Sequence, residues 1–217
     1  MNYQENHWDG SYYELGVIIE PYNSQDKIIS ALNCIINSNL ITGLWIDRKD
    51  TGIFEKSFLK SHFRSLKDLQ IYNYYSEVKI LDYNPIGCLI IIIQDGINTW
   101  FDLCIPLEML DLIVEVEYPL YTQTNPWIFE VDSFFIKIAD LLSSNLFFDF
   151  AMIGEEISGY MTPEELTVEE LKKSGYLLSD RYRKKFNTVP FKMITESGLY
   201  WYPNKGIQIS FDPNSRD

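Results

Sequence analysis

Residues 88–105 read CLIIIIQDGINTWFDLCI and contain the clearest hairpin signal in the chain. Asp95-Gly96 separates two apolar runs, and this dipeptide favours the positive φ angles of a type I′ turn. The pattern predicts two antiparallel strands, Cys88–Gln94 and Ile97–Ile105, with Pro106 ending the second. Because the first run is apolar at consecutive positions, we expect that strand to be central and buried.

The residues before this hairpin predict a strand, a helix, a strand and a second helix. Tyr12–Glu20 and Leu40–Asp47 are rich in β-branched and aromatic residues, which indicates strands. Between them, apolar residues recur at helical spacing over residues 24–38, with Ser24 as the candidate N-cap. A second amphipathic helix is expected over Glu55–Leu69.

The opening pattern recurs about half a chain later. Asp132–Leu146 aligns with Asp26–Leu40 at a constant offset of 106 residues and without a gap. The apolar positions of the two segments coincide, and a strand-like stretch follows each of them. An internal duplication would explain the pattern, with similar halves over about 11–110 and 111–212. A chance likeness between two amphipathic helices is the alternative.

The second half continues with a helix-start signal and several short strands. Thr162, Pro163 and Glu165 have the spacing of a capping box, which predicts a helix over 163–174 with Gly175 as its C-cap. Aromatic and β-branched residues between turn residues then predict short strands over Phe191–Thr195, Leu199–Tyr202 and Gly206–Phe211.

Together these elements predict an α+β fold, with a mixed or antiparallel sheet and amphipathic helices. Hydrophobic residues make up 46% of the chain, which is enough for a packed core. No Gly/Ser-rich or Pro-rich linker interrupts the sequence, so we expect residues 1–217 to form a single compact domain. Two similar β-α-β-α-β-β halves within that domain would follow from a duplication.

Charge is distributed very unevenly along the chain. The net charge is −13, but residues 80–171 hold 17 acidic residues and a single basic residue, Lys137, for a net −16. A field of this kind repels nucleic acid and attracts cationic partners. The main basic group lies at Arg181, Arg183, Lys184 and Lys185. We expect that group either to neutralise acidic residues of the same molecule or to be exposed.

Residue types that carry catalysis or hold cofactors are sparse. Cys34, Cys88 and Cys104 each lie in an apolar run, where a free cysteine packs as a small hydrophobe, and His7 and His62 are far apart in sequence. No nucleophile elbow, phosphate-binding loop or zinc-ligand spacing occurs. The polar start and the shortness of the apolar runs indicate neither a signal peptide nor a membrane span. We expect a cytoplasmic protein that is not an enzyme, with no cofactor, metal, nucleic-acid or membrane partner.

A metal-dependent hydrolase or nuclease is one alternative. Glu77 and Lys79 lie on the same face of a strand-like segment, as some metal-dependent nucleases require, and Asp68 lies upstream. A surface salt bridge is the simpler explanation for that pair. Glu155-Glu156 follows an apolar strand and offers oxygen ligands for Mg²⁺ or Ca²⁺. Adjacent side chains of a strand point to opposite faces, so a bend would be needed for both to bind one ion.

The strongest functional signal is a cluster of six glutamates within sixteen residues, with no basic residue among them. Such a cluster is either a solvated surface or a docking surface that steers a basic protein partner. The net −16 of the whole segment favours docking. Exposed aromatic residues would supply the desolvated contacts. The residues predicted to bind a partner are Glu155, Glu156, Tyr160, Glu164, Glu165, Glu169, Glu170, Trp201 and Tyr202.

An acidic α+β composition without catalytic residue patterns resembles that of bacterial immunity proteins, which inhibit toxin domains. The resemblance is one of composition; it covers no diagnostic motif and assigns no residue. It implies an inhibitor that blocks a basic toxin or nuclease domain sterically and electrostatically. An unspecified interaction module is the remaining alternative.

Overall fold

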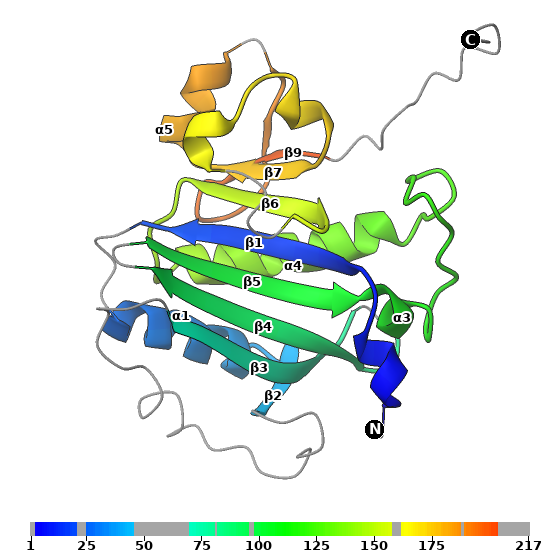
Figure 1. Cartoon of the computed structure of the whole chain (residues 1–217). Helices are drawn as coiled ribbons and strands as arrows, with labels where there is room; N and C mark the ends of the chain where they lie inside the picture. The colour runs from blue at the N-terminus through cyan, green and yellow to red at the C-terminus, as the bar shows by residue number, and fades with distance from the viewer. Residues whose placement is uncertain are drawn as a thin grey trace, which may run out of the picture.

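The computed structural model describes residues 3–20, 25–45, 70–80, 82–95, 98–157, 162–187 and 189–203. These residues form an α+β fold around a nine-stranded sheet with the order β2-β3-β4-β5-β1-β6-β7-β9-β8, in which all neighbours are antiparallel (Figure 1). The strands are β1 (Tyr12–Ile19), β2 (Ile41–Trp45), β3 (Gln70–Val78), β4 (Ile86–Asp95), β5 (Asn98–Pro106), β6 (Phe150–Glu155), β7 (Gly175–Leu178), β8 (Lys192–Met193) and β9 (Tyr200–Tyr202). The predicted fold class is confirmed.

Two long helices and several short ones connect these strands. The long helices are α1 (Gln25–Asn37) and α4 (Ile128–Ser143). The short helices and 3₁₀ turns of the described ranges are η1 (Glu5–Trp8), α3 (Leu107–Leu110), η2 (Pro163–Glu165), η3 (Glu170–Lys172), α5 (Asp180–Arg183) and η4 (Lys184–Phe186).

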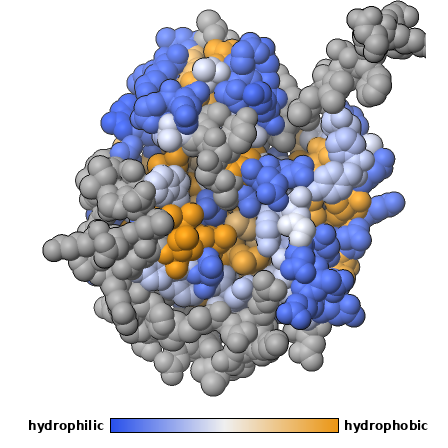
Figure 2. Space-filling model, in the orientation of Figure 1, coloured by the Kyte–Doolittle hydropathy of each residue, from blue (hydrophilic) through white to orange (hydrophobic). Residues whose placement is uncertain are grey.

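The predicted hairpin forms and lies near the middle of the sheet. β4 pairs with β5 on one edge and with β3 on the other. Because side chains alternate between the two faces of a strand, Ile90 and Ile92 are buried while Ile91 and Ile93 are half-exposed. Figure 2 looks onto this half-exposed face. β4 is therefore central, as expected, but its two faces are buried to different extents.

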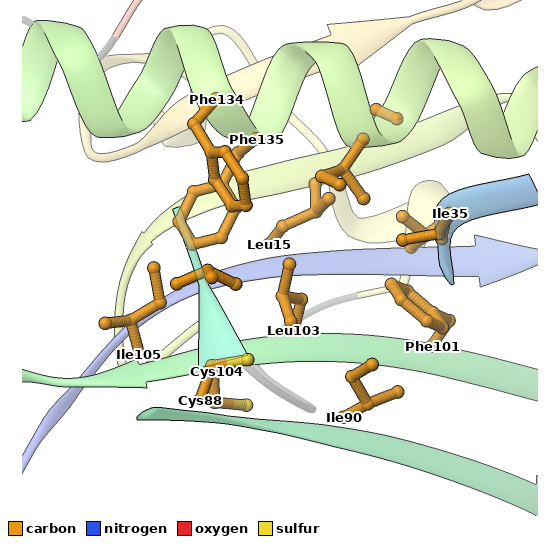
Figure 3. Close-up of a cluster of buried hydrophobic side chains, with 14 of the residues drawn as sticks. Leu15, Ile35, Cys88, Ile90, Phe101, Leu103, Cys104, Ile105, Phe134 and Phe135 are labelled. Atoms are coloured by element: carbon orange, nitrogen blue, oxygen red, sulfur yellow. The ribbon is translucent and has the colours of Figure 1, made fainter. Parts of the chain in front are cut away.

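The main core lies between the sheet and the two long helices. Leu15 from β1 and Phe101 and Leu103 from β5 pack with Ile35 of α1 and Phe135 of α4, and each of these side chains is at most 1% exposed (Figure 3). Burying a side chain of this size contributes about 1.5–3 kcal/mol. This layer is therefore a principal source of the protein's stability.

Helices α1 and α4 contact each other and contain the segments that align in the sequence. Ser30 Oγ donates a hydrogen bond to Asn145 Oδ1 at 3.1 Å, and Asn145 Nδ2 donates to Cys34 Sγ at 3.2 Å. Each helix buries its apolar face, and a strand follows each of them, β2 after α1 and β6 after α4. The duplication and the single-domain organisation both stay predictions.

The prediction of a helix over 163–174 is wrong, because that segment forms two separate 3₁₀ turns, η2 and η3. The capping box is present, but Leu166 then adopts an extended conformation (φ −65°, ψ 120°) and ends the first turn. Leu166 and Leu171 are both buried in a second apolar cluster, against the other face of β6, β7 and β9. Placing both leucines on the sheet requires the chain to leave the helical path. Gly175 begins β7 instead of capping a helix.

The strands expected near residues 12–20, 40–47, 191–195 and 199–202 all form, with shorter bounds, as β1, β2, β8 and β9. Other predictions concern residues outside the described ranges, namely Ser24, Glu55–Leu69 with His62, Asp68, Tyr160 and Gly206–Phe211.

The carboxyl group of Asp132 is buried against the main core. Asp132 of α4 accepts a hydrogen bond from Tyr13 Oη of β1 at 2.8 Å. Burial raises the pKa of Asp132 to about 7, and the hydrogen bond from Tyr13 opposes part of that rise. The carboxyl group therefore keeps its proton at acidic pH values where an exposed aspartate is charged.

The substitution Asp132→Asn tests this burial. Because the pKa is raised on folding, the stability that this group contributes is fully present below about pH 4 and is lost as the pH rises to about 7. The free energy of unfolding of the wild type should fall by up to about 4 kcal/mol across that window, and that of Asp132→Asn by clearly less. Urea denaturation at the two ends of the window measures the difference. Equal falls would contradict a buried, ionisable carboxyl group.

Candidate docking surface

The six glutamates predicted as a docking surface divide into two groups. Glu155 is the last residue of β6, and Glu156 follows it with a positive φ of 51°. The other four lie on η2, on η3 or next to them: Glu164, Glu165, Glu169 and Glu170. The second group therefore belongs to the segment that covers the second apolar cluster.

Two glutamates of that second group have basic partners. Glu169 Oε1 lies 2.8 Å from Lys172 Nζ, and Glu170 Oε1 lies 2.7 Å from Lys173 Nζ. Exposed ion pairs of this kind contribute little to stability, about 0–1 kcal/mol. They do, however, offset the negative charge that a basic partner would meet.

Glu165 has a local structural role. Its carboxylate accepts hydrogen bonds from Thr162 N at 2.7 Å and from Thr162 Oγ1 at 3.0 Å. These hydrogen bonds lower the pKa of Glu165, the bond from the backbone N–H most strongly. The carboxylate therefore caps the N-terminal end of η2.

The two aromatic residues of the predicted surface pack against the sheet. Tyr202 is only 6% exposed, and its ring centroid lies 5.5 Å from that of Phe191. Trp201 is half-buried over Gly175, where an added Cβ would lie 2.2 Å from the indole ring. Tyr202 cannot reach a partner from this position. Both residues therefore contribute to packing within the protein.

A further group of acidic residues, which the sequence analysis did not single out, lies beside the end of β6. It occupies α3 and the loop over 111–127, and its signal in the sequence is four acidic residues without a base over 108–117. Figure 1 shows α3 and this loop on the side of the sheet where β1 begins and β6 ends. Figure 2 shows hydrophilic residues gathered over η1 and α3. We name the following six residues the acidic rim: Glu108, Asp111, Glu115, Glu117, Glu155 and Glu156.

Two hydrogen bonds join the two parts of the acidic rim to each other and to β1. Tyr118 Oη, from the loop, donates to Glu155 Oε1 at 2.7 Å. The backbone N–H of Tyr12, at the start of β1, donates to Glu156 Oε1 at 3.1 Å. Residues that are distant in the sequence therefore form one surface.

Glu108 lies against the backbone at Gly10. A Cβ at Gly10 would lie 2.3 Å from Glu108 Oε1, and the φ of 91° at Gly10 also favours glycine.

Partial burial raises the pKa of Tyr118 to about 12. The hydrogen bond to Glu155 and the charge of Glu108 add to the rise, and a hydrogen bond with Ser11 opposes it. The phenol therefore stays a hydrogen-bond donor at neutral pH.

Within the described ranges, no lysine or arginine forms an ion pair with a carboxylate of the acidic rim. The basic group near residue 181 instead pairs with acidic residues elsewhere: Arg181 with Glu20 and Asp149, and Arg183 and Lys184 with Asp180. Hydrogen bonds from Lys184 and Arg183 lower the pKa of Asp180 to about 2. This basic group thus neutralises acids of its own neighbourhood and leaves the rim uncompensated.

One buried side chain holds the loop that carries the acidic rim. Asn125 Nδ2 donates to the carbonyl oxygens of Glu117 (2.7 Å) and Tyr121 (3.2 Å). Asn125 Oδ1 accepts from Glu117 N at 2.8 Å and from Trp127 Nε1 at 3.1 Å. Breaking these bonds would leave buried polar groups unpaired, which is costly. The loop is therefore preorganised before any partner binds.

Two exposed apolar side chains lie on the same loop. Leu112 is 50% exposed and Tyr118 is 57% exposed. Aromatic and aliphatic side chains surrounded by charged groups are the usual composition of a protein interface, with an apolar centre and a polar border.

Other kinds of site find less support among the described residues. In these ranges no group of three or more His, Cys, Asp or Glu side chains could hold a metal ion. Glu77 accepts a hydrogen bond from Tyr3 Oη at 3.2 Å and, within the described ranges, forms no ion pair with Lys79, so the surface salt bridge expected for that pair is wrong. Burial raises the pKa of the Cys88 and Cys104 thiols, so both stay protonated and unreactive. None of the described helices is long and apolar enough to cross a membrane.

Comparisons with known proteins give one distant structural likeness. No protein-family model and no curated protein matches the chain. A matching chain comes from the crystal structure of the toxic C-terminal tip of CdiA from Pseudomonas aeruginosa in complex with immune protein. The match has 13% sequence identity and a TM-score of 0.41, and it covers 68% of this chain and 89% of that chain. A likeness this distant supports no argument about function.

The substitution Asn125→Ala tests whether this side chain orders the loop. It should lower the free energy of unfolding by about 2–4 kcal/mol, because several buried hydrogen bonds lose a partner. The amide proton of Glu117 should also exchange faster with solvent. Gln123→Ala, at an exposed position of the same loop, is the control and should change stability by less than about 0.5 kcal/mol. Unchanged exchange at Glu117 would contradict the role of Asn125.

Proposed function

We propose that this protein is a cytoplasmic binding inhibitor that docks a basic protein on its acidic rim. The observation that carries the proposal is the combination found there: six carboxylates without ion-pair partners in the described ranges, on a preorganised loop that also exposes Leu112 and Tyr118. Each part alone is common on protein surfaces; together they fit an interface.

The carboxylates would act mainly on the rate of association. Charges that are not offset by neighbours create a field that extends about 8 Å at physiological ionic strength. Such a field speeds the encounter with a cationic surface and disfavours acidic competitors. The net −13 of the chain acts in the same direction at longer range.

The apolar side chains would hold the complex once it has formed. A few well-packed aromatic or aliphatic residues supply most of the binding energy at typical interfaces. Leu112 and Tyr118 are exposed in the free protein, so their burial by a partner would remove apolar surface from water. The order imposed by Asn125 reduces the entropy lost on binding.

A cationic active site is the kind of surface that such a rim would cover. Nuclease domains bind the phosphate backbone through lysine and arginine side chains. A rigid acidic surface that occupies such a site would block it both sterically and electrostatically. We therefore infer a toxin or nuclease domain as the partner, and inhibition in the manner of bacterial immunity proteins as the function.

The triple variant Glu108→Gln, Glu115→Gln, Glu117→Gln tests the rim. The partner is first captured from the native host at low salt, purified and assayed for activity with and without this protein. The association rate should then fall by about tenfold or more in the triple variant at low salt, and its salt dependence should become shallower. Stopped-flow mixing at two salt concentrations measures both quantities.

The matched control removes the same amount of charge elsewhere, as Glu164→Gln, Glu169→Gln, Glu170→Gln. It should slow association by less than about threefold, because two of these carboxylates already have lysine partners. Equal slowing by both variants would remove the rim from the interface. A captured partner whose activity is unaffected by binding would contradict the inhibitor function.

Tyr118→Ala tests the apolar contact separately from the charges. Loss of a central aromatic side chain should raise the dissociation rate of the complex by about tenfold or more and leave the association rate nearly unchanged. Ile71→Ala, which truncates an exposed apolar residue of β3, is the control. Surface plasmon resonance gives both rates, and an unchanged dissociation rate for Tyr118→Ala would exclude this residue from the interface.

A further inference from the structure

A pocket of about 240 Å³ lies where the turn between α1 and β2, the chain just after β3 and residues 130–137 of α4 meet. Asn39 and Leu40 line it from the turn, and Lys79 lines it from the residue after β3. The backbone N–H of Lys79 donates to the carbonyl of Leu40 at 3.2 Å, which fixes these two walls together. The residues of α4 that line the pocket are Glu130, Ser133, Phe134 and Lys137.

Two lysines contribute positive charge to this pocket, and neither Lys79 nor Lys137 forms an ion pair within the described ranges. Lys137 is also the single base of the segment 80–171. Five other basic residues do pair with acids: Lys172, Lys173, Arg181, Arg183 and Lys184. Two like charges at one pocket repel each other, and a bound anion would replace that repulsion with attraction.

The remaining lining groups limit the size and charge of the anion. Glu130 is half-buried and reduces the formal charge of the lining to +1, which disfavours a highly charged ligand. Phe134 is buried and gives the pocket an apolar wall. Ser133 Oγ already donates to Phe129 O at 2.7 Å, so the donors left for an anion are the two lysines and the amide of Asn39. A volume below the roughly 300 Å³ of typical drug-sized sites requires a small ligand.

The geometry points to a binding site for a small oxyanion, a carboxylate or phosphate group, held between Lys79 and Lys137. Charged hydrogen bonds from ammonium groups to such oxygens are short and strong, and an apolar part of the ligand would rest on Phe134. The same chemistry serves a free small molecule and an acidic side chain of a bound protein. The site shares no residue with the acidic rim and does not depend on the proposed inhibitor function.

The test titrates the full-length protein with inorganic phosphate, with succinate and with a hexaglutamate peptide, at constant ionic strength. Backbone amide shifts in the NMR spectrum report binding at the pocket. Lys79→Gln and Lys137→Gln should each weaken binding by about tenfold, because each removes a charged hydrogen bond. Glu130→Gln should strengthen it by about threefold, since it removes a repulsive charge. Lys192→Gln, at an exposed lysine of β8, is the control and should have no effect.

Each outcome either identifies the source of the anion, a free small molecule or an acidic side chain, or rules out the site. Saturable binding of phosphate or succinate supports a free small anion as the ligand, and binding of hexaglutamate alone supports an acidic side chain of a partner. Absence of saturable shifts with all three probes overturns the proposal. So does equal affinity in the wild type and the two lysine variants, or weaker binding in Glu130→Gln. Circular dichroism of every variant confirms that the fold is kept.

Discussion

Burial of one face of the central strands beneath α1 and α4 is the interaction on which the rest of the structure depends. The β4–β5 hairpin supplies two neighbouring strands to this layer, and β1 pairs with the far edge of β5. The chain leaves the core at the end of β5, beside the end of β6, and continues into α3 and the loop to α4. The acidic rim lies there because the strand order brings the end of β5 and the end of β6 to the same side of the sheet.

Local sequence patterns predicted most of the regular elements, but only two residues of the acidic rim, Glu155 and Glu156. The Asp95-Gly96 turn and the apolar periodicities identified the hairpin, β1 and the two long helices, since these signals are local. The pairing of β1 with β6 is non-local, so the contact of Tyr118 with Glu155 could not be predicted from spacing. The same holds for Tyr202, whose burial depends on its pairing with β7. The two turns after Thr162 arose because buried leucines outweighed a good helix-start signal.

Charge in the described part of the protein follows a consistent division. Near residue 181, basic and acidic side chains pair with each other. The carboxylates of the acidic rim have no ion-pair partners in the described ranges. The two lysines of the pocket, Lys79 and Lys137, have none there either. Exposed pairs contribute at most about 1 kcal/mol each, so, apart from the pair between Arg181 and the buried Asp149, this division matters little for stability. Its consequence is a directional field, negative at the rim and locally positive at the pocket. A field of that form would orient an approaching partner as well as attract it.

The most direct test of a docking rim is hydrogen–deuterium exchange of this chain with and without its purified partner. A docking rim requires slower exchange over residues 107–118 and 155–157 in the complex, because those backbone segments would lie beneath the partner. Slower exchange confined to residues 162–173, with the rim unchanged, would contradict it.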